Sequence, residues 1–192
     1  NKLLQYDLLR YLFPDTTNCT RGDKSALALI QAAMENTDER IAQDKPVTPA
    51  FILAALLWPV VNVRRARLET RGEAPMPALN SAAQQVIQDA VNHISIPRRF
   101  SQPMREIWEF QLRLQRRTGR KALELIEHRR FRAAYDFLLL REQAGEDTGE
   151  LGQWWTDLQE LPAEQRVAMV SAVPDGHKRP GRTRTRRPNP VP

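Results

Sequence analysis

The sequence predicts an all-α protein, in which an irregular array of several helices is followed by a disordered basic C-terminal tail. Leu and Ala together number 43, whereas Val and Ile number 18 and Gly only 8, so residues that favour helices outnumber those that favour strands. Helix start and stop signals recur along the chain, with no alternation of helical and strand patterns. The last residues, rich in Pro, Gly, Arg and Thr, are too poor in apolar side chains to build a core.

The first half of the chain contains four predicted helices. Residues 2–9 have an amphipathic pattern directly after Asn1, so we expect the chain to be a fragment. Asp23 can cap a helix over 24–43, which the sequence Asp44-Lys45-Pro46 should end. Thr48 and Pro49 start an apolar helix over 50–58, and Pro59 should kink or interrupt it. Residues 71–77 have the composition of a loop, and a helix over 80–94 follows.

The second half predicts four more helices and the tail. The first runs from Ser101 or Pro103 to about Thr118, with Gly119 as its stop or as a weak point. The others cover 121–127, 131–143 and, after a polar break at 144–149, 151–161. We therefore expect a helical body over residues 1–97, a basic helical arm over 98–165 and a disordered Arg-rich tail over 166–192.

Several classes of protein and site are not supported by this sequence. The single Cys19 cannot form an internal disulfide and suits a reducing compartment. The longest apolar run, 51–61, is too short to span a membrane, so we expect no membrane span. The three histidines, His93, His128 and His177, are scattered, and none pairs with Cys19 at the spacing of metal ligands. We find no phosphate-binding loop and no Asp-x-Asp pair, so we predict no catalytic residue, no metal site and no cofactor in this chain.

The net charge of +6 comes from two basic zones. Residues 177–192 contain six basic residues and no acidic one, and the rest of the chain is neutral. Residues 98–132 contain eleven basic and four acidic residues. At helical spacing, 104–114 separates into an apolar face and a positive face interrupted by Glu109. The apolar face consists of Met104, Ile107, Phe110 and Leu114, widened by Trp108 and Leu112. The positive face consists of Arg105, Arg113, Arg116 and Arg117, and Arg120 joins it if the helix continues through Gly119.

These positive residues predict a surface that binds nucleic acid. Arg dominates both zones, and its guanidinium suits bidentate phosphate contacts and stacking on bases. The predicted contacts are Arg98, Arg99, Arg105, Arg113, Arg116, Arg117, Arg120, Lys121, Arg129, Arg130 and Arg132, with Lys178, Arg179, Arg182, Arg184, Arg186 and Arg187 in the tail. The alternatives are a solvated charged face, a solubilising tail, contact with an anionic membrane, or docking of an acidic protein. We expect the four tryptophans to be core residues, with base stacking by Trp154 or Trp155 as the alternative.

A series of motifs resembles the C-terminal half of bacterial poly(A) polymerases, in that family's order. The motifs are Glu35-Asn36-Thr37-Asp38 with Arg40, Pro49-Ala50-Phe51, Ile96-Pro97-Arg98-Arg99, Ile107-Trp108, Phe131 to Leu138 with Leu140-Arg141, Trp154-Trp155 and the Arg-rich tail. The related tRNA CCA-adding enzymes are the alternative family, but the tail and the stretch 131–136 look more like the polymerase.

The resemblance implies an RNA-binding part of an enzyme whose chemistry lies elsewhere. Members of the family add adenosine residues from ATP to RNA 3′ ends, with a metal-dependent catalytic head that this chain lacks. ATP and Mg²⁺ are therefore expected for the head and not for this chain. The implied partners are RNA 3′ ends and RNA-chaperone or RNA-degradation proteins. We expect a cytoplasmic monomer that acts in mRNA polyadenylation and decay. A non-enzymatic helical adaptor that binds RNA or protein remains the competing hypothesis.

Overall fold

The computed structural model describes residues 7–173, which form ten helices and no strand. The helices are α2 (Leu9–Leu12), α3 (Pro14–Gly22), α4 (Lys24–Ala42), α5 (Pro49–Thr70), α6 (Pro75–Val91), α7 (Arg98–Arg113), α8 (Gly119–Ile126), α9 (Phe131–Gln143), α10 (Leu151–Glu160) and α11 (Ala163–Ala172). The predicted all-α class is confirmed. Most of the helix expected over 2–9 and the tail from 174 lie outside the described residues.

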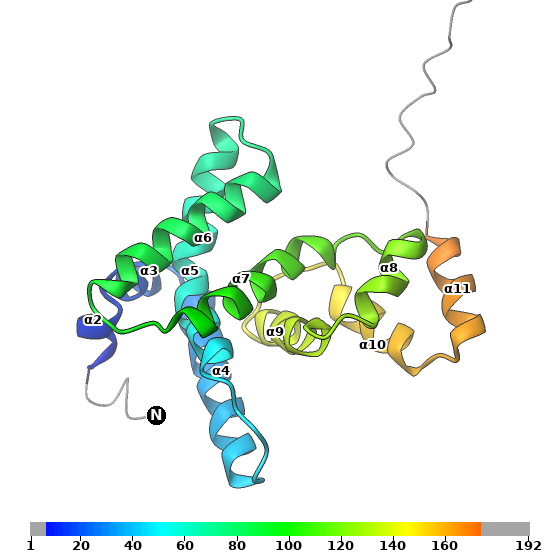
Figure 1. Ribbon diagram of the computed structural model, residues 1–192, viewed down its shortest axis with the longest axis horizontal. Coiled ribbons are helices and arrows are strands. Elements are labelled where there is room, and N and C mark those ends of the chain that lie inside the picture. Colours follow the sequence, from blue (N-terminus) through cyan, green and yellow to red (C-terminus); the bar gives the residue numbers. More distant parts are fainter. Residues whose placement is uncertain (1–6, 174–192) are drawn as a thin grey trace, which may run out of the picture.

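The first hydrophobic cluster is built around α5, which contacts α3, α4, α6, α7 and α9. Its members include Ala54, Ala55 and Val61, which are fully buried, and aromatic rings from three helices. Phe137 packs edge-on against Trp58 and Phe51, with ring centroids 5.7 and 6.0 Å apart. In Figure 1 this cluster occupies the end of the molecule that contains α2 to α6.

The second cluster lies at the other end, among α8, α9, α10 and α11 (Figure 1). Trp155 is its central ring, packed against Phe131 and Trp154 at centroid distances of 5.4 and 4.8 Å. The helix α7 belongs to both clusters, because Ile107 and Trp108 are in the first and Phe110 and Leu114 are in the second. The helix α9 is shared in the same way.

A buried polar network lies where the two clusters meet. Arg141 is 8% exposed, and its Nη1 donates to the Gln111 side-chain oxygen at 2.8 Å. Its Nε donates to the Glu146 carboxylate at 2.8 Å, and its guanidinium lies 5.1 Å from the Trp58 ring centroid. The Gln111 amide donates to two backbone carbonyls, those of Ile107 and Ala134. This network ties α7, α9 and the following loop together without leaving the buried charge unpaired.

Pro59 is expected from the sequence to kink or interrupt its helix. The interruption is wrong, because α5 runs unbroken from Pro49 to Thr70. A proline inside a helix removes one backbone N–H and so leaves the carbonyl of Ala55 without its usual donor. Two buried side chains donate to the carbonyls of the residues on either side of Ala55. Trp108 Nε1 donates to the carbonyl of Ala54 at 3.1 Å, and Thr16 Oγ1 donates to that of Leu56 at 2.9 Å. These tertiary hydrogen bonds hold this part of the helix in place.

Two other predicted boundaries are also wrong. The helix α6 begins at Pro75, inside the predicted loop, because proline is tolerated in a first turn. The helix α7 begins at Arg98 and ends at Arg113, so it neither starts at Ser101 or Pro103 nor reaches Thr118. Gly119, with φ +67°, opens α8. By contrast, Asp23 caps α4 as predicted, accepting from the backbone N–H of Ser25 at 2.9 Å.

The predicted tail starts too early. Residues 166–172 belong to α11, whose Val170 is buried in the second cluster, so disorder over this stretch is wrong. The division of the chain at 97 and 98 stays a prediction.

The helix α5 is long and apolar enough to be a candidate membrane span by composition alone. Its most apolar 18-residue window has a mean hydropathy of 1.2, and half of that window is buried inside the fold. A buried core helix meets the same criterion, and the five helices around α5 give it that role here.

Candidate nucleic-acid interface

The helix α7 has one buried and one exposed side, as predicted. Met104, Ile107, Trp108, Phe110 and Leu114 are all 2% exposed or less. The opposite side carries four arginines: Arg98, Arg99 and Arg113 are exposed, and Arg105 is half-buried. The buried side is anchored in both clusters, so the cations lie on a helix that the core fixes in place.

Two carboxylates on α7 reduce its positive charge, and one of them pairs with arginines that lie outside this helix. Glu109 pairs with Arg113 at 2.9 Å. Glu106 pairs with Arg130 at 2.6 Å and with Arg129 at 3.6 Å, both from the turn before α9. The result is a surface with six guanidinium groups and two carboxylates, which we call the α7 basic face. It consists of Arg98, Arg99, Arg105, Arg113, Arg129 and Arg130, with Glu106 and Glu109.

The electrostatics of this surface hold Glu106 in its charged form. Burial raises the pKa of the Glu106 carboxyl, but hydrogen bonds from Arg130 and Gln102 and the nearby positive charges outweigh it. The pKa of Glu106 therefore lies below its usual value. The ion pairs that position Arg129 and Arg130 are thus present at neutral pH.

Some of the predicted contact residues form ion pairs and others do not. Arg120 pairs with Glu124 at 3.0 Å, and Arg132 pairs with Asp136 at 2.9 Å. Within residues 7–173, the predicted contacts without an ion pair are Arg98, Arg99, Arg105, Arg116, Arg117 and Lys121. The placement of Arg116 and Arg117 on the same helix as Arg105 is wrong, because α7 ends before them, and the condition under which Arg120 would join them is not met. Arg120 and Lys121 lie on α8, which packs on α9 and α11.

The structure adds one arginine that the charge analysis missed. Arg40, on α4, lies close enough to Asp136 to lower the pKa of that carboxyl, as Arg132 does. Burial is the larger effect, and the pKa of Asp136 is raised. The packing of α4 on α9 therefore places Arg40 near Arg132, far from it in sequence. The only sequence signal for Arg40 was its place in a family motif.

The tryptophans are mainly core residues. Trp58 and Trp108 are buried, and Trp155 is fully buried, with its Nε1 donating to the carbonyl of Leu114 at 2.9 Å. Trp155 is therefore excluded as a base-stacking residue. Trp154 is half-buried at the surface of α10.

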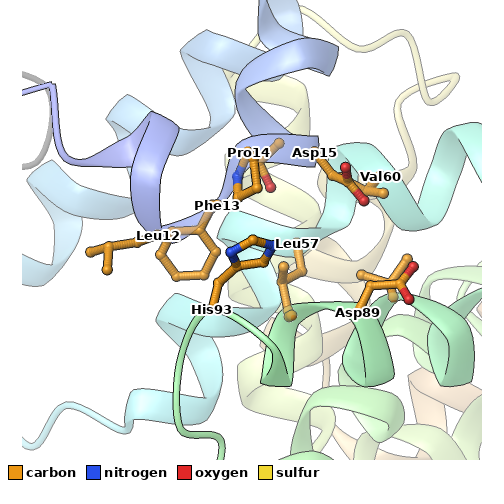
Figure 2. A pocket seen from close by; sticks show the side chains of 11 residues that line it. Leu12, Phe13, Pro14, Asp15, Leu57, Val60, Asp89 and His93 are labelled. Carbon is orange, nitrogen blue, oxygen red and sulfur yellow. The ribbon is translucent and has the colours of Figure 1, made fainter.

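Neither of two surface hollows has the residues of the α7 basic face in its lining. The first, of about 310 Å³, is lined by Leu57, Val60, the Asp15 and Asp89 carboxylates and His93, which lies beside Phe13 and Pro14 (Figure 2). Arg64 pairs with both of these carboxylates, at 2.8 and 2.6 Å. The second, of about 560 Å³, is lined in part by Trp58, Arg141 and Glu146, which already bond to one another or stack. Among the described residues, no three His, Cys, Asp or Glu side chains gather closely enough to hold a metal ion.

Comparison with known proteins identifies the family. Residues 71–189 match a family model described as the polymerase A arginine-rich C-terminus. The chain belongs to this family. The predicted resemblance to the C-terminal region of bacterial poly(A) polymerase is thereby confirmed.

Relatives named poly(A) polymerase I support membership of the arginine-rich C-terminus family. The chain is 35% identical to the protein of Salmonella typhi over 97% of its own length. It is also 35% identical to the protein of Escherichia coli O6:H1 and 33% identical to that of Haemophilus influenzae. The chain spans 42%, 41% and 40% of the lengths of these relatives, respectively. The six predicted tail contacts lie outside the described residues, and all six fall within a family match that is named for its arginines.

Proposed function

We propose that this chain is the RNA-binding C-terminal part of a bacterial poly(A) polymerase, an enzyme that adds adenosine residues from ATP to RNA 3′ ends. The observation that carries the proposal is the α7 basic face, where six guanidinium groups meet two carboxylates on a helix fixed by two cores. The names of the relatives favour this polymerase over a CCA-adding enzyme.

In this proposal the face holds the phosphate backbone of RNA. Arg98, Arg99 and Arg105 have no ion pair within residues 7–173, so phosphate contact displaces no existing carboxylate partner. Phosphate contacts release counterions and fix the position of the strand, but they carry little sequence information. ATP and Mg²⁺ bind in the catalytic head, and this chain guides the RNA 3′ end toward it.

The tail residues 177–187 contribute nonspecific capture in the same proposal. Their six positive charges can meet phosphates along a strand and raise both affinity and association rate. We further propose that the protein acts as a monomer in the cytoplasm, in mRNA polyadenylation and decay, with RNA-chaperone or RNA-degradation proteins as partners.

Salt dependence of oligo(A) binding tests the α7 basic face. We expect Arg98→Gln with Arg99→Gln and Arg105→Gln to weaken binding and to reduce the slope of log K against log salt by about 2, since each phosphate contact on a single strand contributes about 0.7. The matched control changes Arg21, Arg67 and Arg71 to Gln, because these arginines are exposed and have no ion pair within the described residues. Equal losses in the two triple variants would show that only net charge matters and would remove the face from the proposal.

Deletion of residues 177–192 tests the tail. If all six charges meet phosphates, the slope should fall by about 4. An unchanged slope would exclude the tail from the complex.

The competing function is docking of an acidic protein on the α7 basic face, a surface that already accommodates Glu106 and Glu109. A competition experiment distinguishes the two functions. If both ligands use this face, oligo(A) displaces the acidic protein. If the acidic protein binds and oligo(A) does not, the result favours the adaptor.

A further inference from the structure

The exposed side of α10 carries only negative charge. Residues 142–165 contain seven acidic residues and no basic one. Glu150 and the exposed side chains of Asp157 and Glu160 recur at helical spacing, and Glu164 follows at the start of α11. We call these four residues the α10 acidic face. None of them forms an ion pair within residues 7–173.

This face offers arginine both of the contacts that a guanidinium makes best. Exposed carboxylates accept bidentate hydrogen bonds. The half-buried ring of Trp154 lies beside them on α10, one turn before Asp157 and Leu158, and a guanidinium can stack on an aromatic ring. The buried side of α10, with Trp155 and Leu158 fully inside the second cluster, keeps the face fixed in place.

The complementary segment belongs to the same chain. Six basic residues without an acidic one lie between 177 and 187, directly after α11, which packs against α10. Lys178 is six residues beyond Ala172, so an extended chain brings it up to about 20 Å from the end of α11, and Arg187 up to about 50 Å. The helix α10 is only about 15 Å long. The tail can therefore reach the whole face.

We propose that residues 177–187 dock on the α10 acidic face when no RNA is bound, so that RNA and this face compete for the same arginines. The competition with RNA rests on the proposed function, whereas the contact itself does not. A short tether gives the tail a millimolar effective concentration at the face, so contacts too weak to hold a free peptide suffice within one chain. Exposed ion pairs are screened by salt, so the contact is reversible.

Paramagnetic relaxation enhancement in the full chain tests the contact without RNA. A spin label at Asn189→Cys, with Cys19→Ser, should broaden the α10 amide signals and the indole N–H signal of Trp154. The broadening should disappear in Asp157→Asn with Glu160→Gln and Glu164→Gln, and also at about 1 M salt, where the Debye length is about 3 Å. The matched control neutralises Glu35, Asp38 and Glu39, three exposed acidic residues of α4 that also have no ion pair within the described residues. It should leave the broadening unchanged.

Three results would overturn the intramolecular contact. One is broadening that is spread evenly over α4 and α7 as well as α10. Another is broadening that survives neutralisation of the face. The third is broadening of an isotope-labelled chain by a spin label on a second, unlabelled copy, because that would assign the face to the tail of another molecule.

Oligo(A) binding then tests the competition. If the face holds the tail for half to nine-tenths of the time, its neutralisation should tighten binding by about twofold to tenfold, since apparent affinity is reduced by the competent fraction. The same substitutions in a chain that ends at residue 176 report the general effect of charge, and an equal gain there would refute the competition. If oligo(A) does not bind at all while the α10 signals remain broadened, the proposed function fails and the tail contact stands.

Discussion

Arg141 shows how strongly a single residue depends on its partners in this fold. Its guanidinium is nearly buried, so its charge relies on Glu146 and on the Gln111 oxygen. We expect Glu146→Gln to lower the free energy of unfolding by about 2–3 kcal/mol, because it leaves a buried positive charge without its counterion. Urea unfolding measures the difference.

The control for this change is Glu124→Gln. Glu124 also pairs with an arginine, but the Arg120 and Glu124 side chains are 90% and 60% exposed. Exposed pairs contribute about 0–1 kcal/mol, so this variant should be nearly neutral. Equal losses in both variants would mean that burial of Arg141 has no energetic consequence.

Glu106 predicts a pH dependence with a definite sign. Its pKa is lowered in the folded protein, so its charged form stabilises the fold above the usual pKa of 4.5, and this contribution is lost as the pH falls through the lowered folded value. Asp136, with a raised pKa, has the opposite sign and favours the fold as the pH falls toward its usual 3.8.

The Glu106→Gln variant should therefore lose less stability than the original protein when the pH is lowered from 6 to about 3. Asp136→Asn should lose more over the same interval, since it lacks the compensating group. Thermal unfolding across this pH range provides the measurement, and parallel curves for all three proteins would contradict the assigned shifts.

The sequence predicts which residues of α7 are buried, but it does not predict which charged residues pair with one another. The buried residues of α7 follow from helical spacing, because burial of one side needs no knowledge of the partner. The pairing of Glu106 with Arg130 does not, since 24 positions separate them and only the turn before α9 brings them together.

At the scale of the helices, Gly152 lies where the start of α10 packs against the end of α9. A Cβ atom there would lie 2.8 Å from Leu139 Cδ2 and would collide with the Glu142 carboxylate. The other oxygen of that carboxylate accepts from the Gly152 backbone N–H at 2.7 Å and from the Thr148 hydroxyl, so these two hydrogen bonds oppose its displacement. We expect Gly152→Ala to cost about 1–3 kcal/mol in chemical unfolding.

Gly22→Ala is the matched substitution for this test. Gly22 ends α3, and a Cβ atom there would meet nothing within 4 Å. Alanine favours a helix over glycine by up to about 1 kcal/mol, so this variant should be neutral or stabilised. A loss as large as that of Gly152→Ala would point to backbone freedom and not to the contact with Glu142.

Prolines explain most of the errors in the predicted helices. The helix over 131–143 agrees with α9 because its apolar spacing and its flanking polar residues give the same boundaries. Pro59 and Pro103, by contrast, lie inside α5 and α7. Local preference opposes both. Next to the carbonyl that Pro59 leaves without a donor, Thr16 and Trp108 donate to the carbonyls of Leu56 and Ala54, and only the tertiary fold supplies these hydrogen bonds.

At the scale of the whole molecule, α7 and α9 join the two hydrophobic clusters, so we expect them to unfold together. Ile107→Ala in the first cluster and Leu114→Ala in the second should each cost about 2–5 kcal/mol. Each should shift the same single transition, observed at one denaturant concentration by circular dichroism and by tryptophan fluorescence. Two separate transitions, each sensitive to one variant, would show that the clusters are independent domains.

The buried side of α7 is packed along the length of the helix, so the spacing of the cations on its exposed side is fixed. The Cα atoms of Arg98 and Arg113 lie fifteen residues apart on α7, which fixes about 22 Å between the first and last cation of that helix. A flexible strand placed along it must adjust its own spacing, because the helix can neither stretch nor bend without disturbing Trp108 and Phe110 beneath it. If RNA binds this face as proposed, the length of strand that it covers is therefore set by the protein and should be the same for every RNA sequence.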